Sequence, residues 1–137
     1  MFFKDSNKDN KQEDFIKITA LLIHAAKIDE SYSNQEEIII KNALSKMGVK
    51  EQDIQKIIEK AKTIETNSNQ ILDFTKEIKR MKEEDKIKII ETLWRIIYSN
   101  KEADMYENNL MRRLGGLLYI DNKIMGNIKD KIKKENL

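Results

Sequence analysis

The chain contains no cysteine, no proline and a single histidine among its 137 residues. Without cysteine it has no disulfide, no thiolate metal ligand and no cysteine nucleophile. One histidine cannot form a zinc site alone, and it cannot supply the paired Glu-x-x-His motifs of a di-iron bundle. Because glycine occurs only four times, turn signals are few and helix-forming residues dominate. The sequence therefore predicts an all-α fold.

The chain also has almost no net charge, since 26 basic residues face 24 acidic ones, for a net charge of +2. A balance of this kind does not indicate a nucleic-acid-binding protein. We find no Ser-His-Asp spacing and no glycine-rich phosphate loop, so we predict that the protein is not an enzyme. No apolar run resembles a signal peptide or a transmembrane segment, and we expect a cytoplasmic protein.

Apolar residues recur at helical spacing along most of the chain and predict about seven helices. Residues 1–11 are mostly polar and are predicted to form a mobile N-terminal arm, whereas residues 12–137 are predicted to form one helical domain. Gly48 is expected to end the second of these helices in the left-handed conformation. Asp121 is expected to cap the last one.

Two helix starts carry the same capping pattern. Ser33 and Glu36 match a capping box, in which the serine hydroxyl and the glutamate carboxylate each accept a hydrogen bond from a backbone N–H of the first turn. Asp104 and Glu107 repeat the pattern, with aspartate in the role of serine. A shift of 71 residues places Ser33 on Asp104 and Glu36 on Glu107, and it also aligns the apolar helices before the two bends. The sequence thus predicts two helical hairpin repeats, packed around a pseudo-twofold axis with their bends at related surface positions.

The two bends resemble those of the tellurite-resistance protein B (TerB) family. The resemblance is carried by residues 26–36 (AKIDESYSNQE), by residues 99–107 (SNKEADMYE) and by the LMRRL segment at residues 110–114. It extends over roughly residues 15–132, nearly the whole chain. A similar domain forms the N-terminus of the membrane-anchored J-domain cochaperone DjlA. The resemblance implies a TerB-like all-α fold and a non-enzymatic binding or adaptor domain in a cytoplasmic stress response.

The chain departs from the family pattern at both bends. Glu30 and Lys101 stand where the family has glycine, and the acidic residue Asp29 is matched by Asn100 in the second bend. The second bend has therefore lost one negative charge, which weakens any cation site there.

The oxygen-bearing side chains of the bends suggest a site for a divalent cation such as Ca²⁺ or Mg²⁺. The candidate ligands are Asp29, Ser33 and Glu36 in the first repeat, and Asp104 and Glu107 in the second. A second interpretation stays open, in which the two glutamates only stabilise the positive N-termini of their helices. Asp29 is less easily explained in this way, because a carboxylate at the C-terminal end of a helix opposes the dipole.

We expect the partner to be another protein, and two alternatives to metal-tuned binding stay open. One is a metal-independent protein-interaction module. The other is a peripheral membrane-surface protein that uses the basic C-terminal segment, where Lys123, Lys129, Lys131, Lys133 and Lys134 gather. Lysines near a helix C-terminus are also favoured by the helix dipole alone.

Two further features have structural interpretations. His24 lies beside the apolar face of the first helix and is predicted to sit at the edge of the core. Gly115 and Gly116 lie inside a predicted helix, where each costs roughly 1 kcal/mol relative to alanine. We expect close helix packing to compensate for this cost.

Overall fold

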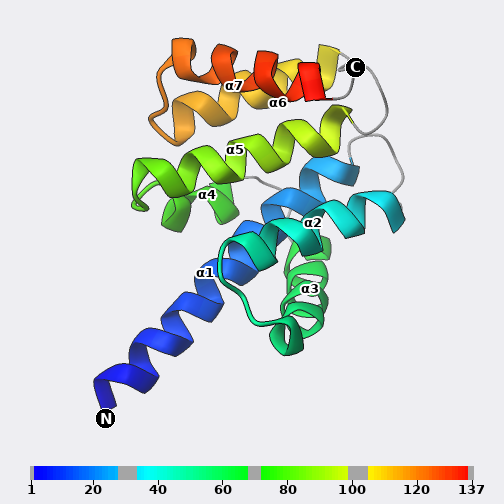
Figure 1. Ribbon diagram of the computed structural model, residues 1–137. Helices are drawn as coiled ribbons and strands as arrows, with labels where there is room; N and C mark the ends of the chain where they lie inside the picture. Colours follow the sequence, from blue (N-terminus) through cyan, green and yellow to red (C-terminus); the bar gives the residue numbers. More distant parts are fainter. Residues whose placement is uncertain (1, 28–33, 68–71, 99–104, 136–137) are drawn as a thin grey trace.

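The computed structural model describes residues 2–27, 34–67, 72–98 and 105–135, with side chains for 12–27, 34–67, 74–76, 78–98 and 108–135. Within these ranges the chain forms seven helices and no strand (Figure 1). The helices are α1 (Phe2–Ala26), α2 (Asn34–Lys46), α3 (Glu51–Thr66), α4 (Leu72–Ile78), α5 (Glu83–Tyr98), α6 (Met105–Leu117) and α7 (Asn122–Glu135). The prediction of an all-α fold with about seven helices is confirmed.

The first helix differs from the sequence-based expectation. α1 begins at Phe2, so residues 2–11 continue the helix and do not form a separate arm before it. Neither proline nor glycine interrupts this stretch, which allows the helix to continue beyond the apolar part that packs on the domain. Figure 1 shows the N-terminal part of α1 extending away from the other helices. Whether this extension is mobile stays a prediction.

α1 is the central helix and packs against α2, α3, α4 and α5. Its second half is apolar on nearly every side, which is typical of a helix that is buried all round. Ile18, Leu21, Leu22 and Ile23 are completely buried. α5 lies between α1 and the pair formed by α6 and α7 (Figure 1). The domain therefore has one continuous core, which extends from α3 through α1 and α5 to α7.

The internal repeat is visible in the bounds of the helices. α2 begins at Asn34 and α6 at Met105, 71 residues later, and the same shift relates the starts of α3 and α7 at Glu51 and Asn122. Each repeat therefore has three helices, α1–α3 and α5–α7, one more than the predicted hairpin. α1 and α5 pack against each other, which agrees with two related units arranged around a pseudo-twofold axis.

Both repeats end their second helix with the same turn. The Val49 N–H donates to the Leu44 carbonyl oxygen at 3.0 Å, and the Ile120 N–H donates to the Gly115 carbonyl oxygen at 2.9 Å. These four residues occupy equivalent positions of the repeat. Gly48 has a φ of 98°, which confirms the predicted left-handed helix end.

The paired glycines of α6 have different surroundings. A Cβ atom on Gly115 would lie 3.2 Å from Cγ of Met125, so the close packing expected there is present between α6 and α7. The same expectation is wrong for Gly116, because an added Cβ would meet no atom within 4 Å. Gly116 lies on the exposed side of α6.

Candidate functional site

Of the five predicted cation ligands, Glu36 and Glu107 lie in the first turns of α2 and α6. The structure describes the side chain of only one of them, Glu36. Asp29, Ser33 and Asp104 lie outside the described residues, and for Glu107 only the backbone in the first turn of α6 is described. Glu36 and Glu107 are each the third residue of their helix, which is the position predicted from the capping pattern.

Glu36 is almost completely buried, with 2% of its surface exposed. Its neighbour Glu37 is partly buried and is paired with Lys62 at 3.1 Å and with Lys41 at 3.9 Å. A glutamate is rarely buried to the extent of Glu36 unless its carboxylate is paired or hydrogen-bonded. The start of α2 therefore holds a carboxylate inside the protein, directly after the first bend.

A second buried carboxylate, Glu65, lies next to the C-terminal end of α1. Glu65 belongs to the last turn of α3 and is 7% exposed. Its carboxylate accepts a hydrogen bond from Nζ of Lys27 at 2.6 Å, and Nδ1 of His24 lies 3.5 Å away. The ring of His24 also lies 6.3 Å from that of Phe74, and its side chain is 27% exposed, as expected for a residue at the core edge.

Sequence reasoning did not identify Glu65. The residue continues the buried stripe of α3 formed by Ile54, Ile58 and Ala61, so a glutamate at an otherwise apolar helical position was the available signal. Because two basic side chains contact its carboxylate, Glu65 serves to attach the end of α1 to the end of α3. It does not resemble a metal ligand.

The second repeat has a corresponding attachment. Arg95 occupies the position equivalent to His24, and its Nε donates to Oε2 of Glu135, near the end of α7, at 3.2 Å. Arg95 also contacts Glu91 at 3.5 Å. In both repeats an ion pair thus connects the first helix, just before the bend, with the third helix. This ion pair holds the C-terminal end of the first helix of each repeat, where the bend begins, against the third helix.

The described part of the chain contains no group of three or more His, Asp or Glu side chains that could hold a metal ion. The side chains of four of the five predicted ligands, all except Glu36, are not among those described. The cation site at the bends therefore stays a prediction.

The basic C-terminal segment forms α7. Lys131 pairs with Glu91 at 3.7 Å, and Nζ of Lys129 donates to Oδ1 of Asn108 at 3.1 Å. Two of the five lysines thus contact side chains of the domain. None of the helices described has the length and apolar character needed to cross a membrane.

Comparisons with known proteins identify the family of this chain. Neither the curated proteins nor the solved structures gave a significant match to the chain. The family model of the tellurite resistance protein TerB matches residues 15–130, which include both bends and the helices that flank them. With this match over most of its length, the chain belongs to the TerB family.

Proposed function

We propose that the chain is a non-enzymatic binding domain of a cytoplasmic stress response, in which a divalent cation tunes the recognition of a protein partner. The cation, Ca²⁺ or Mg²⁺ by the chemistry of the ligands, binds at the first bend through Asp29, Ser33 and Glu36. The observation that carries this proposal is the burial of Glu36 at the start of α2.

The argument depends on the cost of burying a carboxylate. Removing a charged group from water costs several kcal/mol unless other groups compensate. Glu36 already takes part in an interaction within the protein, and the N-terminus of α2 adds to it, because the helix dipole favours a negative charge there. A cation shared with Asp29 and Ser33 adds a full positive charge and uses oxygen ligands that Ca²⁺ and Mg²⁺ prefer.

The second bend supports a weaker site. Glu107 is the third residue of α6, as Glu36 is of α2, and Asp104 precedes the helix. Asn100 stands at the position of Asp29, so the second site has one negative charge fewer. We expect it to bind a cation less tightly, or only after the first site is filled.

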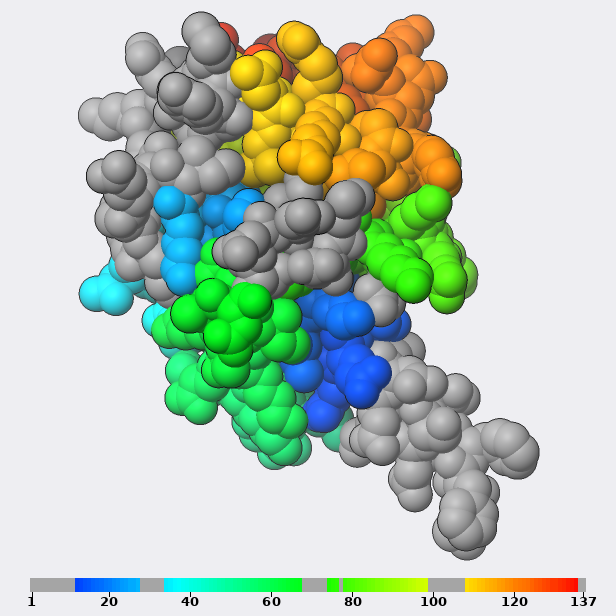
Figure 2. Space-filling view, turned by 180° about the vertical axis from the view of Figure 1, so that it is seen from behind, coloured from blue at the N-terminus to red at the C-terminus, as the bar shows by residue number. Residues whose placement is uncertain are grey.

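Metal-independent protein binding is the second candidate, and a groove of about 560 Å³ between α1 and α3 favours it. Ile16 and Ile64 provide its apolar walls, and Lys17 and Lys60 flank it. Ile64 is 38% exposed. Figure 2 shows α1 and α3 side by side on this face. Contact with a membrane surface would use the α7 lysines, of which Lys129 and Lys131 also contact side chains of the domain.

An amide NMR titration with Ca²⁺, Mg²⁺, Mn²⁺ and Zn²⁺ tests the proposal. We expect saturable shifts at residues 29–36, with smaller ones at residues 100–107. Asp29→Asn and Glu36→Gln should each abolish the shifts at residues 29–36. Circular dichroism should show that both variants remain helical.

Glu37→Gln is the matched control, because it removes a neighbouring carboxylate whose partners are surface lysines. It should leave the titration unchanged. If the unmodified protein shows no saturable shift below about 1 mM metal, the cation proposal is wrong, and the groove between α1 and α3 becomes the site to test.

A further inference from the structure

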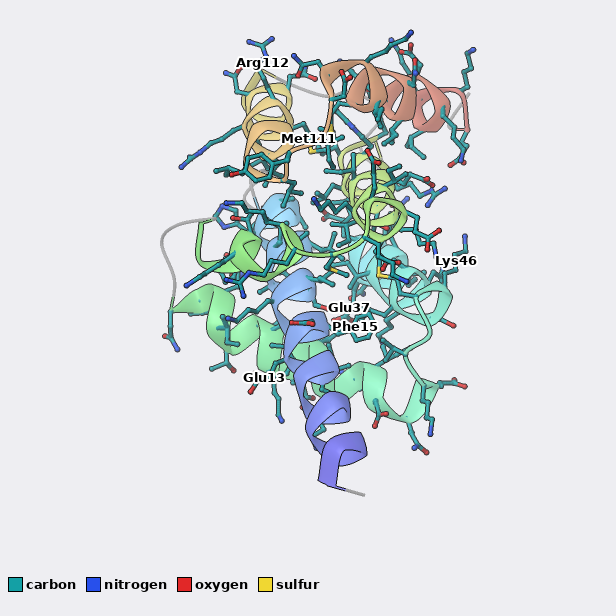
Figure 3. The ribbon with its side chains drawn as sticks, turned by 90° about the vertical axis from the view of Figure 1, so that its left-hand side faces the viewer. Glu13, Phe15, Glu37, Lys46, Met111 and Arg112 are labelled. Carbon is teal, nitrogen blue, oxygen red and sulfur yellow. The ribbon has the colours of Figure 1, made fainter. Side chains whose placement is uncertain are left out.

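A second candidate site lies between α5, α6 and α7, where the chain forms a cavity of about 450 Å³. This volume is within the range of small-molecule binding sites. Trp94, Met111 and Met125 contribute apolar surface to it, and Arg112 and Lys129 contribute positive charge. Figure 3 shows Met111 on the side of α6 that faces the other helices and Arg112 at its outer side, in agreement with their burial and exposure.

The two basic residues of this cavity have no carboxylate partner among the side chains that the structure describes. In the part of the chain for which side chains are described, neither Arg112 nor Lys129 forms an ion pair with a carboxylate. Lys129 donates to the neutral amide oxygen of Asn108 at 3.1 Å, and its Nζ lies 5.3 Å from the centre of the Trp94 ring. The cavity therefore combines an apolar wall with uncompensated positive charge.

The first repeat provides an internal comparison. Lys41 and Glu37 occupy the positions of Arg112 and Asn108, and they form an ion pair at 3.9 Å. Glu37 is also paired with Lys62 at 3.1 Å. In the second repeat an asparagine replaces this glutamate, so the basic residue at the equivalent position has lost its acidic partner.

Two more exchanges make the second repeat more positive. A groove between α2 and α3, of about 490 Å³, corresponds to the cavity and includes Glu51. The equivalent residue of the cavity is Asn122. Ile58, which is buried in the first repeat, corresponds to Lys129. Two carboxylates have thus become amides, and an apolar residue has become a lysine.

Trp94 gives the cavity a polar group that the first repeat lacks, since Ile23 occupies the equivalent position. The side chain is 3% exposed, and among the described groups its Nε1 has no hydrogen-bond acceptor. A buried indole N–H without an acceptor is uncommon in native proteins. The flexible Lys129 side chain lies over the ring, so its movement would change the environment of the indole.

We propose that this cavity binds a small organic anion. Its apolar part packs against Trp94, Met111 and Met125, and its acidic group, a carboxylate or a phosphate, pairs with Lys129 and Arg112. The acidic group draws the Lys129 ammonium away from the Trp94 ring, which changes the environment of the indole. The residues that line this site include none of the predicted cation ligands, and the site does not depend on the cation proposal.

The single tryptophan of the chain makes the site directly observable. Its side chain gives one indole peak in a ¹H–¹⁵N spectrum, and displacement of the Lys129 ammonium from the ring shifts this peak. We would titrate the full chain with benzoate, with phenyl phosphate and with the neutral benzyl alcohol. Saturable shifts with the anions, and binding of the alcohol weaker by about ten-fold or more, are expected. The tighter of the two anions identifies the preferred acidic group.

Charge variants show whether the effect belongs to the cavity. Lys129→Gln and Arg112→Gln should each weaken anion binding by about ten-fold, which is typical of losing one charge-assisted contact. Lys131→Gln makes the same change elsewhere on α7, and Lys41→Gln makes it at the position equivalent to Arg112. Both controls should bind the anions as the unmodified protein does.

Three results would overturn the proposal. The first is the absence of a saturable indole shift up to about 10 mM of either anion. The second is equal binding of benzyl alcohol, which would leave no role for charge. The third is an equal loss of binding in Lys131→Gln, which would indicate a general charge effect.

Discussion

Tyr119 occupies the position of the second repeat that Gly48 occupies in the first, and both residues have a positive φ, 57° and 98° respectively. Tyr119 is the only described residue other than glycine with a positive φ. A non-glycine residue in this region costs roughly 1 kcal/mol or more. The second repeat therefore uses a strained residue for a turn that the first repeat makes with glycine.

Substitutions at these two positions should reveal the backbone strain at the turns. Gly48→Ala is expected to lower the free energy of unfolding by about 1 kcal/mol, because no side chain lies near its Cβ position and only the backbone is affected. Tyr119→Gly is expected to raise it by up to about 1 kcal/mol. Urea denaturation measures both. A clear loss of stability in Tyr119→Gly would mean that the tyrosine ring contributes more than its backbone costs.

Tyr119 should also ionise at a lower pH than an ordinary tyrosine, because its pKa is lowered. A hydrogen bond with the Lys79 side chain, together with the charge of that residue, lowers the pKa of the phenol from its usual 10.0. The Lys79 Nζ lies 4.6 Å from the ring centre. The interaction of the ionised Tyr119 with Lys79 stabilises the folded state, because the pKa of Tyr119 is lower there than in the unfolded chain. This stabilisation is fully present above the pKa of the unfolded state, and it is lost as the pH falls through the pKa of the folded state.

Phenolate absorbance measures this effect. One of the four tyrosines should titrate below its usual pKa, and Lys79→Gln should move that titration upward. The step should be missing in Tyr119→Phe. An unchanged step in Lys79→Gln would show that another group lowers the pKa.

The Glu65 attachment should stabilise the first repeat. Glu65→Gln is expected to lower the free energy of unfolding by about 1–2 kcal/mol, because it removes a buried charge-assisted hydrogen bond. The expected loss of stability is modest because Lys27 is 41% exposed, so solvent screens its ion pair with Glu65. Glu59→Gln on the exposed side of α3 should change stability by less than about 0.5 kcal/mol. Equal stability of the two variants would contradict the role given to Glu65.

The two glycines of α6 should respond differently to substitution. Gly116→Ala is expected to raise stability by roughly 0.5–1 kcal/mol, since the position is helical, exposed and free of contacts. Gly115→Ala should gain less or lose stability, because its Cβ would lie 3.2 Å from Met125. Thermal melting compares the two. An equal gain in both variants would mean that Met125 moves at no cost.

Much of the fold could be predicted from local sequence. The periodicity predicted about seven helices, and the described residues form seven. Oδ1 of Asp121 accepts a hydrogen bond from the Lys123 N–H at 2.9 Å, as expected of a helix cap. The capping pattern also placed Glu36 and Glu107 at equivalent positions. Residues 2–11 were not predicted to be helical, although α1 includes them, because a polar helix that extends beyond the core carries no apolar period.

By itself, the sequence determined the helical class, the main helix boundaries and the repeat, because periodicity and capping depend on residues within a few positions of one another. Only the tertiary structure decided that Glu65 is buried against Lys27, 38 residues away, and that Trp94 and Lys129 meet at a cavity between three helices. Such contacts depend on how helices pack, and the pattern of a single helix does not specify its neighbours.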